Sequence, residues 1–214
     1  MQNNLKYKNI IFDADGTLLD THAGVHKSIN YAMQKLNLPL FSLEQVKPFL
    51  GPSLVDTMTN TLKYPLEKAK EIVAVYREFY AIEGYAICEL FAGVKDMLFA
   101  LKDIGCTLTI ATNKAQPYIE KIMQEKGVYN LFSGIFGQQL GQFSSDKTPL
   151  VIEAAKLATP AIMVGDRFID IVAAKNANIH SIGVNWGSAE VGEFEKYKPT
   201  YIIDNPMQIL EVIK

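Results

Sequence analysis

The sequence predicts an α/β protein, a doubly wound parallel sheet core with a helical cap domain inserted after the first strand. From Gly93 onward, apolar runs of strand length alternate with helix-length segments that end at glycines such as Gly105 and Gly127. Between about Thr21 and Gly84, apolar residues recur at helical spacing instead, and we expect no strand there. Strands and helices that alternate along a chain form a parallel sheet covered by helices on both faces.

The first strand is the apolar run Ile10–Phe12, which ends abruptly at Asp13, as a buried parallel strand does. Two helical stripes follow in the insertion: Val25, Ile29, Met33 and Leu36, then Val73, Tyr76 and Tyr80. The later elements are expected in this order: helix 93–104, strand 107–111, helix 115–126, strand 134–137, helix 147–157, strand 161–164, helix 168–176, strand 179–184, strand 201–203 and a helix from Pro206. We therefore expect a core domain of residues 1–19 and 87–214 and an inserted cap domain of residues 20–86.

Composition places the chain among globular proteins. Its 214 residues are 49% apolar with a formal net charge of -2, which suits a buried core and offers no basic surplus for nucleic acid. Cys88 and Cys106 belong to no Cys-x-x-Cys pair, so we expect reduced, structural thiols. Because no apolar run approaches the length of a signal peptide or a membrane span, we expect a cytoplasmic protein without a membrane partner. The oligomeric state is left open.

Polar residues follow three of the expected strands. They are Asp13 and Asp15 after the first strand, Thr112 and Asn113 after strand 107–111, and Asp166 after strand 161–164. In an open parallel sheet, ligands bind outside the carboxyl ends of the strands. We therefore expect these side chains to converge on one crevice.

Asp13 and Asp15 are two carboxylates that can divide a phosphoryl-transfer reaction, one attacking phosphorus and the other handling the proton of the leaving group. Gly16 lets the backbone turn sharply and approach a phosphate. The alternatives are a surface turn or a calcium loop. A calcium loop needs a third acidic or amide residue before the glycine, and the sequence does not supply one.

Asp166 and Asp170 are four residues apart where a strand gives way to a helix, so their carboxylates are expected on one face of the first turn. Hard oxygen ligands beside a phosphate site suit Mg²⁺. The alternative is that Asp166 caps the helix while Asp170 complements the helix dipole.

Thr112 and Lys147 can clamp a phosphate, because a hydroxyl and an ammonium group stabilise the equatorial oxygens of a transferring phosphoryl group. Each residue alone is a weak signal, since a threonine after a strand is usually a cap and a lysine at a helix start is usually solvated.

Together these motifs resemble those of the haloacid dehalogenase-like phosphatases. The first motif is matched by Asp13-x-Asp15-Gly16-Thr17-Leu18, the second by Thr112, the third by Lys147 in Asp146-Lys147-Thr148-Pro149, and the fourth by Gly165-Asp166-x-x-x-Asp170. The resemblance implies a magnesium-dependent phosphatase that forms an aspartyl-phosphate. It implies that Asp13 is the nucleophile and a metal ligand, and that Asp15 is the acid/base and offers its backbone carbonyl to Mg²⁺. It also implies that Thr112, Lys147 and the backbone of Asn113 hold the phosphoryl group, and that Asp166 and Asp170 hold the metal.

The helical insertion resembles the cap of a subgroup that contains phosphoglycolate phosphatases, β-phosphoglucomutases and small 5′-nucleotidase-like enzymes. The runs Phe49-Leu50-Gly51-Pro52-Ser53-Leu54 and Gly165-Asp166-Arg167 are most similar to the phosphoglycolate-phosphatase and nucleotidase-like branch. The partner implied is a small-molecule phosphate ester, phosphoglycolate or, as the alternative, a 5′-nucleotide. Arg167 stands where many relatives carry Ser, a departure that bears on the surroundings of the metal.

Three other functions fit the sequence less well. Mutase relatives typically carry a cap His at the position of Val25, and His26 is turned away by about 100° along a helix. Dehalogenase chemistry does not use the second Asp of the first motif. A non-catalytic binder on the same scaffold is expected to lack the nucleophile, the lysine or a metal carboxylate, and all of these are present.

Substrate specificity is expected to lie in the insertion, in its hinges near 16–21 and 85–91, and in the loop 47–53. Lys47 and Arg77 are candidates for contacting an anionic substrate, with ordinary solvated charges as the alternative. Tyr80 is expected to pack between helices, and Trp186 is assigned no role.

Overall fold

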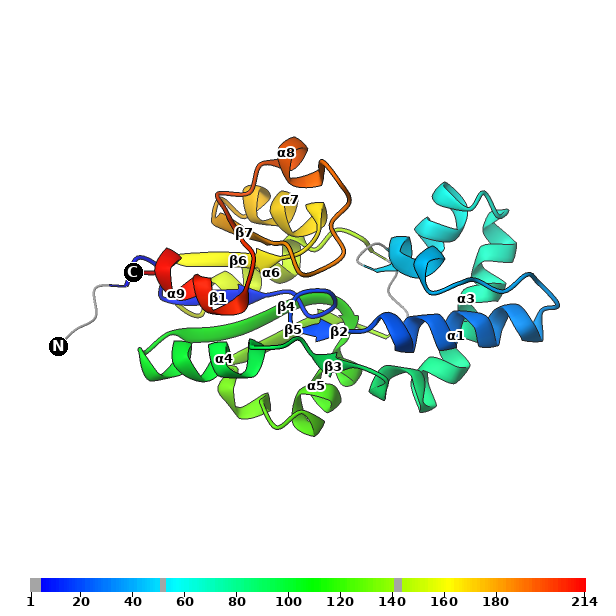
Figure 1. The fold of residues 1–214 in the computed structure, drawn as a ribbon, viewed down its shortest axis with the longest axis horizontal. Helices are drawn as coiled ribbons and strands as arrows, with labels where there is room; N and C mark the ends of the chain where they lie inside the picture. Colours follow the sequence, from blue (N-terminus) through cyan, green and yellow to red (C-terminus); the bar gives the residue numbers. More distant parts are fainter. Residues whose placement is uncertain (1–4, 51–52, 141–143) are drawn as a thin grey trace.

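The computed structural model describes residues 5–50, 53–140 and 144–214, and its core is a six-stranded sheet in the order β5-β4-β1-β6-β7-β8 (Figure 1). Each neighbouring pair in this sheet is parallel. The strands are β1 (Asn9–Phe12), β4 (Thr107–Ala115), β5 (Gly134–Gln138), β6 (Ala161–Gly165), β7 (His180–Val184) and β8 (Tyr201–Ile203). The predicted parallel α/β architecture is confirmed.

Strand β1 lies inside the sheet because it can bury side chains on both faces. Ile10 and Phe12 belong to one apolar cluster, whereas Ile11 belongs to a second cluster on the opposite face. All three are fully buried. Successive side chains of a strand point to opposite faces, so a continuous apolar run fits a strand that is covered on both sides.

Helices cover both faces of the sheet (Figure 1). Ile11 packs in a cluster with Val151 and Ala154 of α6 (Thr148–Ala155) and Ala173 and Ala174 of α7 (Phe168–Asn176). The other face is covered by α4 (Val94–Asp103) and α5 (Gln116–Glu125), with the C-terminal α9 (Ile209–Val212), while α8 (Glu193–Tyr197) packs on α7. This arrangement on two faces is the doubly wound form.

The segment between β1 and α4 contains the helices α1 (His22–Lys35) and α3 (Leu66–Ile82), which pack together and extend beyond one end of the sheet (Figure 1). Shorter turns complete it: 3₁₀ helices at Glu44–Phe49 and Gly84–Ala86, α2 (Leu54–Asp56) and a π turn at Thr57–Thr61. The two connections to the sheet pair as antiparallel β2 (Leu19–Asp20) and β3 (Glu89–Leu90). The domain limits proposed from the sequence stay a prediction.

The prediction for strand 107–111 was wrong at its end. Strand β4 continues to Ala115, so Thr112 and Asn113 lie within the strand and not after it. The reason is an irregularity in the pairing with β5: the register shifts between Thr112 and Ala115, and the ladder resumes beyond it. A bulge of this kind re-aims side chains at the edge of a site.

The other expected elements are present, with ends that differ by a few residues from the predicted limits. The last helix begins as a 3₁₀ turn at Pro206–Gln208 before it becomes α9. Among the described residues, no helix combines the length and the apolar character needed to cross a bilayer.

Candidate active site

Asp13 follows directly after β1 and is buried. Its backbone N–H donates to the carbonyl of Val164 at 2.9 Å, so the pairing with β6 continues to this residue. The chain then turns sharply, because the carbonyl of Ala14 accepts from the N–H groups of Leu18 and Leu19, each at 2.9 Å. The carboxylate of Asp13 is thereby held at the carboxyl end of the central strands.

Two glycines let carboxylates pack directly against the backbone. A Cβ atom on Gly16 would lie 2.1 Å from Oδ2 of Asp166, and one on Gly165 would lie 2.1 Å from Cγ of Asp170. Gly16 also has a φ of +79°, which disfavours any other residue. The small residues of the first and fourth motifs are therefore explained by close approach of an acidic side chain.

Asp13, Asp166 and Asp170 form an acidic triad. One carboxylate oxygen from each lies within 4.8 Å of the other two, and all three residues are buried. Asp166 accepts a hydrogen bond from the backbone N–H of Ser188 at 2.7 Å and another from the hydroxyl of Thr17 at 3.2 Å. Three of the carboxylates predicted from the sequence thus converge.

The alternative in which Asp166 caps the following helix is not what the structure shows. Helix α7 begins at Phe168, and Arg167 occupies the N-cap position. The backbone N–H of Arg167 donates to Oδ2 of Asp170 at 3.0 Å. Asp170 therefore closes the helix start, and Asp166 lies before it.

Lys147 lies at the N-cap position of α6 and is fully buried among these carboxylates. Its Nζ atom is 2.8 Å from Oδ1 of Asp13 and 2.5 Å from Oδ1 of Asp170. Burial by itself lowers the pKa of this lysine, but attraction to Asp13 and Asp170 outweighs that effect and raises the pKa. Lys147 is therefore a cation, and it lies against Asp13 and not in solvent.

The triad places three carboxyl groups beside the single ammonium group of Lys147. Burial raises the pKa of Asp166 well above its ordinary value, and repulsion from Asp170 and Asp13 adds to the rise. Burial also raises the pKa of Asp170, to about 6, against the attraction of Lys147. Crowded, buried carboxylate oxygens are the donor set that hard divalent cations bind, so the residues present fit such an ion.

Thr112 and Asn113 lie beside this cluster on β4. The buried hydroxyl of Thr112 accepts from the backbone N–H of Lys114 at 3.3 Å. The amide of Asn113 donates to the carbonyl of Ser145 at 3.3 Å and accepts from the side chain of Gln138 at 2.9 Å. These bonds fix the side chain of Asn113.

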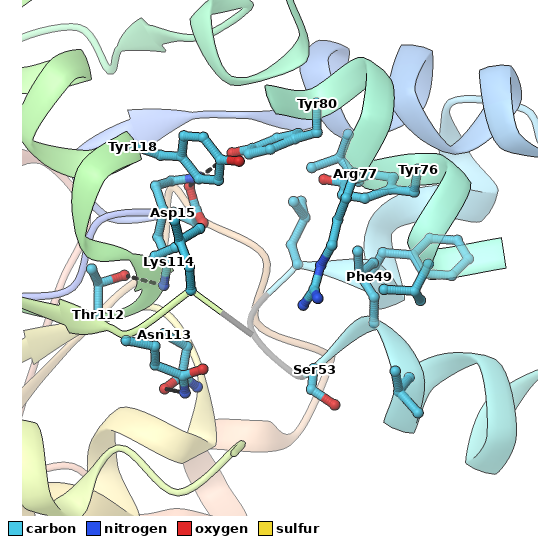
Figure 2. A pocket seen from close by; sticks show the side chains of 18 of the residues that line it. Asp15, Phe49, Ser53, Tyr76, Arg77, Tyr80, Thr112, Asn113, Lys114 and Tyr118 are labelled. Carbon is cyan, nitrogen blue, oxygen red and sulfur yellow. Dashed lines mark hydrogen bonds and ion pairs between the residues drawn. The ribbon is translucent and has the colours of Figure 1, made fainter. Parts of the chain in front are cut away.

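A cavity of about 200 Å³ opens in front of these residues and is lined by Asp13, Asp15, Thr112 and Asn113 (Figure 2). Its other wall comes from the inserted segment and is largely apolar and aromatic. The residues of that wall include Val25, Phe49, Leu54, Val73, Tyr76 and Tyr80. Asp13 belongs both to the cavity and to the acidic triad, and so connects the two.

The candidate specificity residues separate in the structure. Arg77 extends from α3 into the cavity (Figure 2), whereas Lys47 is paired with Glu44 at 2.6 Å on the surface. Ser53 from the loop 47–53 also lines the cavity, and residues 51–52 lie outside the described residues.

Val25 faces the cavity, while His26 makes a 2.9 Å hydrogen bond to the carbonyl of Phe41. The one-residue offset predicted from helical geometry therefore directs the imidazole to another set of contacts.

Sequence reasoning missed Lys114. Its side chain is 5% exposed, and its Nζ atom lies 3.0 Å from Oδ1 of Asp15 and donates a hydrogen bond to the hydroxyl of Tyr80. A signal was available, because residues two apart on a strand share a face, and Lys114 is two residues beyond Thr112. The predicted end of the strand at residue 111 concealed it.

The contacts of two further residues, Trp186 and Arg167, were not anticipated. Trp186 donates from Nε1 to the carbonyl of Thr17 at 3.0 Å, which supports the turn after β1. The side chain of Arg167 pairs with Glu193 at 3.2 Å and donates to the carbonyl of Leu50 at 2.8 Å. The backbone N–H of Arg167 contacts Asp170 while its guanidinium group reaches the inserted segment, and the expectation that Arg167 bears on the surroundings of a metal stays a prediction.

Comparison with known proteins agrees with this geometry. The model of the haloacid dehalogenase-like hydrolase family matches residues 10–184 of the chain. The chain belongs to this family. The family match, together with similar proteins named as phosphatases, also confirms the predicted enzyme class, a phosphatase.

Individual relatives are similar along almost their full length. A 5′-nucleotidase of Pseudomonas aeruginosa is 29% identical over 98% of this chain and 97% of its own length. A phosphoglycolate phosphatase of Vibrio parahaemolyticus is 29% identical over 96% of both chains. Among solved structures, a putative phosphatase from Clostridium difficile is 33% identical with a TM-score of 0.87 and covers 98% of this chain and 99% of its own.

The close approach at Gly16 predicts the effect of adding one methyl group. Gly16→Ala and Gly105→Ala each place alanine at a positive φ, which costs about 1 kcal/mol in either case. Only the first displaces a carboxylate, since nothing lies within 4 Å of the added Cβ at Gly105. We expect kcat/KM for p-nitrophenyl phosphate to fall about 100-fold in Gly16→Ala and to change little in Gly105→Ala. Equal kcat/KM values for the two variants, both shown to be folded by thermal unfolding, would contradict this explanation.

Proposed function

We propose that this phosphatase hydrolyses small phosphate monoesters in two steps through an aspartyl-phosphate on Asp13. The observation that carries the proposal is the position of Asp13, which is buried with Lys147 at 2.8 Å, belongs to the acidic triad and lines the cavity. In the first step, Oδ of Asp13 attacks phosphorus and the bond between phosphorus and the ester oxygen breaks. In the second, water attacks the same phosphorus and releases inorganic phosphate with regeneration of the carboxylate.

Asp15 is proposed as the acid/base of both steps. It protonates the departing ester oxygen in the first step and takes a proton from the attacking water in the second. Its carboxylate is partly exposed and lines the cavity, as a group that exchanges protons with a substrate requires. The contact with Lys114 holds this carboxylate at the cavity wall.

Thr112, Asn113 and Lys147 are proposed to hold the phosphoryl group. A hydroxyl, an amide and an ammonium group supply donors for the equatorial oxygens, whose charge changes during transfer. Lys147 is already beside Asp13, so it also lies beside the position that a phosphoryl group on Asp13 occupies.

We propose Mg²⁺ as the cofactor, held by the carboxylates of Asp13, Asp166 and Asp170 and by the backbone carbonyl of Asp15. The ion supplies positive charge that offsets the repulsion between a carboxylate nucleophile and a phosphate. The excess of carboxylates over ammonium groups in the triad supports this assignment.

The proposed natural substrate class is a small phosphate ester with a second anionic group, such as phosphoglycolate. Arg77 supports this choice, because its cationic side chain extends into the cavity (Figure 2). The second candidate is a nucleoside 5′-monophosphate, which is favoured by the apolar and aromatic wall that includes Phe49 and Tyr76. The placement of Val25 on the cavity supports hydrolysis over a mutase reaction. A cytoplasmic location stays a prediction.

Activity against p-nitrophenyl phosphate tests the nucleophile and the metal. We expect turnover in Mg²⁺, loss of turnover in excess EDTA and recovery when Mg²⁺ is restored. At saturating Mg²⁺, Asp13→Asn should lower kcat at least about 10³-fold, which corresponds to about 4 kcal/mol of activation free energy. Full activity in EDTA would remove the metal from the proposal, and a folded Asp13→Asn variant with most of the activity would remove the nucleophile.

The acid/base role of Asp15 is tested with two leaving groups. An alkoxide leaves poorly without a proton, whereas p-nitrophenolate leaves readily, so Asp15→Asn should lower kcat/KM much more for an alkyl phosphate. With p-nitrophenyl phosphate, the variant should release one equivalent of p-nitrophenol in a burst and then turn over slowly, since the second step still needs a base. Equal losses on both esters without a burst, in a variant that binds Mg²⁺ normally, would show that Asp15 is not the acid/base.

The substrate class is tested through Arg77. If Arg77 binds a second anionic group, Arg77→Met should raise KM for phosphoglycolate by about 10- to 100-fold, the worth of a charge-assisted hydrogen bond. KM for p-nitrophenyl phosphate, which carries no second anion, should change little. A wild-type kcat/KM that is higher for a nucleoside 5′-monophosphate than for phosphoglycolate, with no selective effect of Arg77→Met, would favour the nucleotidase-like candidate.

A further inference from the structure

Lys114 joins two parts of the chain that are far apart in sequence. On one side its Nζ atom contacts the carboxylate of Asp15 at 3.0 Å, and on the other it donates to the hydroxyl of Tyr80 (Figure 2). Asp15 lies in the turn after β1, and Lys114 lies on β4. Tyr80 lies on α3 of the inserted segment. The ammonium group is therefore a polar link between the inserted helices and the proposed acid/base.

The Tyr80 side chain, which accepts the hydrogen bond from Lys114, is held in place by neighbouring rings. The Tyr80 ring stacks on Tyr76 with centroids 5.2 Å apart, and the ring of Tyr118 meets it edge-on at 5.5 Å. Tyr80 is buried, so its hydroxyl has few orientations available. A hydroxyl fixed in this way holds the lysine end group in one place.

The Lys114 ammonium group, which lies between Tyr80 and Asp15, is shielded from solvent. The Lys114 side chain is 5% exposed, and a buried ammonium group needs polar partners to offset the loss of water. Burial lowers the pKa of Lys114, but attraction to Asp15 and the contact with Tyr80 more than compensate and raise it, so the group is a cation. Its ammonium also lies 5.1 Å from the centroid of the Tyr80 ring. Loss of the hydroxyl would leave the ammonium group with one polar partner fewer and free to shift.

We propose that Tyr80 and Lys114 are positioning residues that hold the Asp15 carboxylate for proton transfer, so that the acid/base step depends on the placement of helix α3. The proposal rests on the proposed function, in which Asp15 protonates the leaving group. Tyr80 acts through Lys114 and needs no contact with the reacting atoms. Closure of the inserted segment over a substrate would then complete the acid/base as well as exclude water.

The test compares Tyr80→Phe with Tyr76→Phe. Both changes remove one hydroxyl from α3 and keep the ring, but only the Tyr80 hydroxyl accepts from Lys114. The quantity measured is kcat/KM for β-glycerophosphate and for p-nitrophenyl phosphate, because kcat/KM reports the steps through departure of the alcohol. Thermal unfolding establishes that each variant is folded.

We expect Tyr80→Phe to lower kcat/KM for β-glycerophosphate about tenfold, less than the loss expected for a full ångström of misplacement. The value for p-nitrophenyl phosphate should stay within about twofold, because its leaving group needs no proton. Tyr76→Phe should leave the ratio of the two kcat/KM values unchanged. In a Lys114→Met background, adding Tyr80→Phe should not change the ratio further, since the hydroxyl acts through the ammonium group.

An unchanged ratio in Tyr80→Phe would overturn the proposal, and so would the same change in Tyr76→Phe. A full effect of Tyr80→Phe in the Lys114→Met background would overturn the route through Lys114. The Asp15→Asn variant separates these outcomes from a failure of the proposed function. If Asp15→Asn leaves the ratio unchanged, the acid/base assignment itself fails; if it changes the ratio and Tyr80→Phe does not, only the positioning role fails.

Discussion

The Lys147 ammonium group lies between two buried carboxylates, 2.8 Å from Asp13 and 2.5 Å from Asp170, with Asp166 in the same cluster. Burying these charges is costly, and the cluster is tolerable only when the opposite charges meet in good geometry. Removing the lysine would leave the three buried carboxyl groups without the positive charge of its ammonium group. The fold must therefore bring together the ends of β1 and β6 and the starts of α6 and α7.

The doubly wound sheet brings these elements together at the carboxyl ends of its parallel strands. Strand β1 pairs with β4 on one side and β6 on the other, so Asp13, Thr112 and Asp166 come from neighbouring strands. Because Ile10 and Ile11 pack into opposite apolar clusters, a slip of β1 by one residue would turn each side chain to the other face and displace Asp13. The register of the sheet thus sets the position of Asp13, the proposed nucleophile. Gly16 and Gly165 have no side chain, so Asp166 and Asp170 can pack directly against the backbone at these positions.

The inserted segment makes polar contacts with the rest of the chain at two places. Tyr80 accepts from Lys114 of β4, and the carbonyl of Leu50 accepts from Arg167 at the start of α7. Arg167 is held in turn by Glu193, while its backbone contacts Asp170. Lys114 is paired with Asp15, the proposed acid/base, and Arg167 directly follows Asp166 of the acidic triad. The position of the inserted helices and the geometry of the site are therefore physically coupled, in addition to the apolar packing that α1 and α3 share with the core.

The sequence by itself predicted the parallel sheet and a helical segment after the first strand, and it named Asp13, Thr112, Lys147, Asp166 and Asp170 as candidate site residues, because apolar runs and chemically distinctive residues at short spacings are local patterns. Tertiary structure decided which groups those residues touch. The pairing of Lys147 with Asp170 joins residues 23 positions apart, and the bond from Lys114 to Tyr80 spans 34. Lys114 was missed because the predicted strand ended at residue 111, and the irregular continuation of β4 to Ala115 depends on pairing with β5. Contacts of this kind depend on how separate elements pack, and no local spacing or composition encodes the packing.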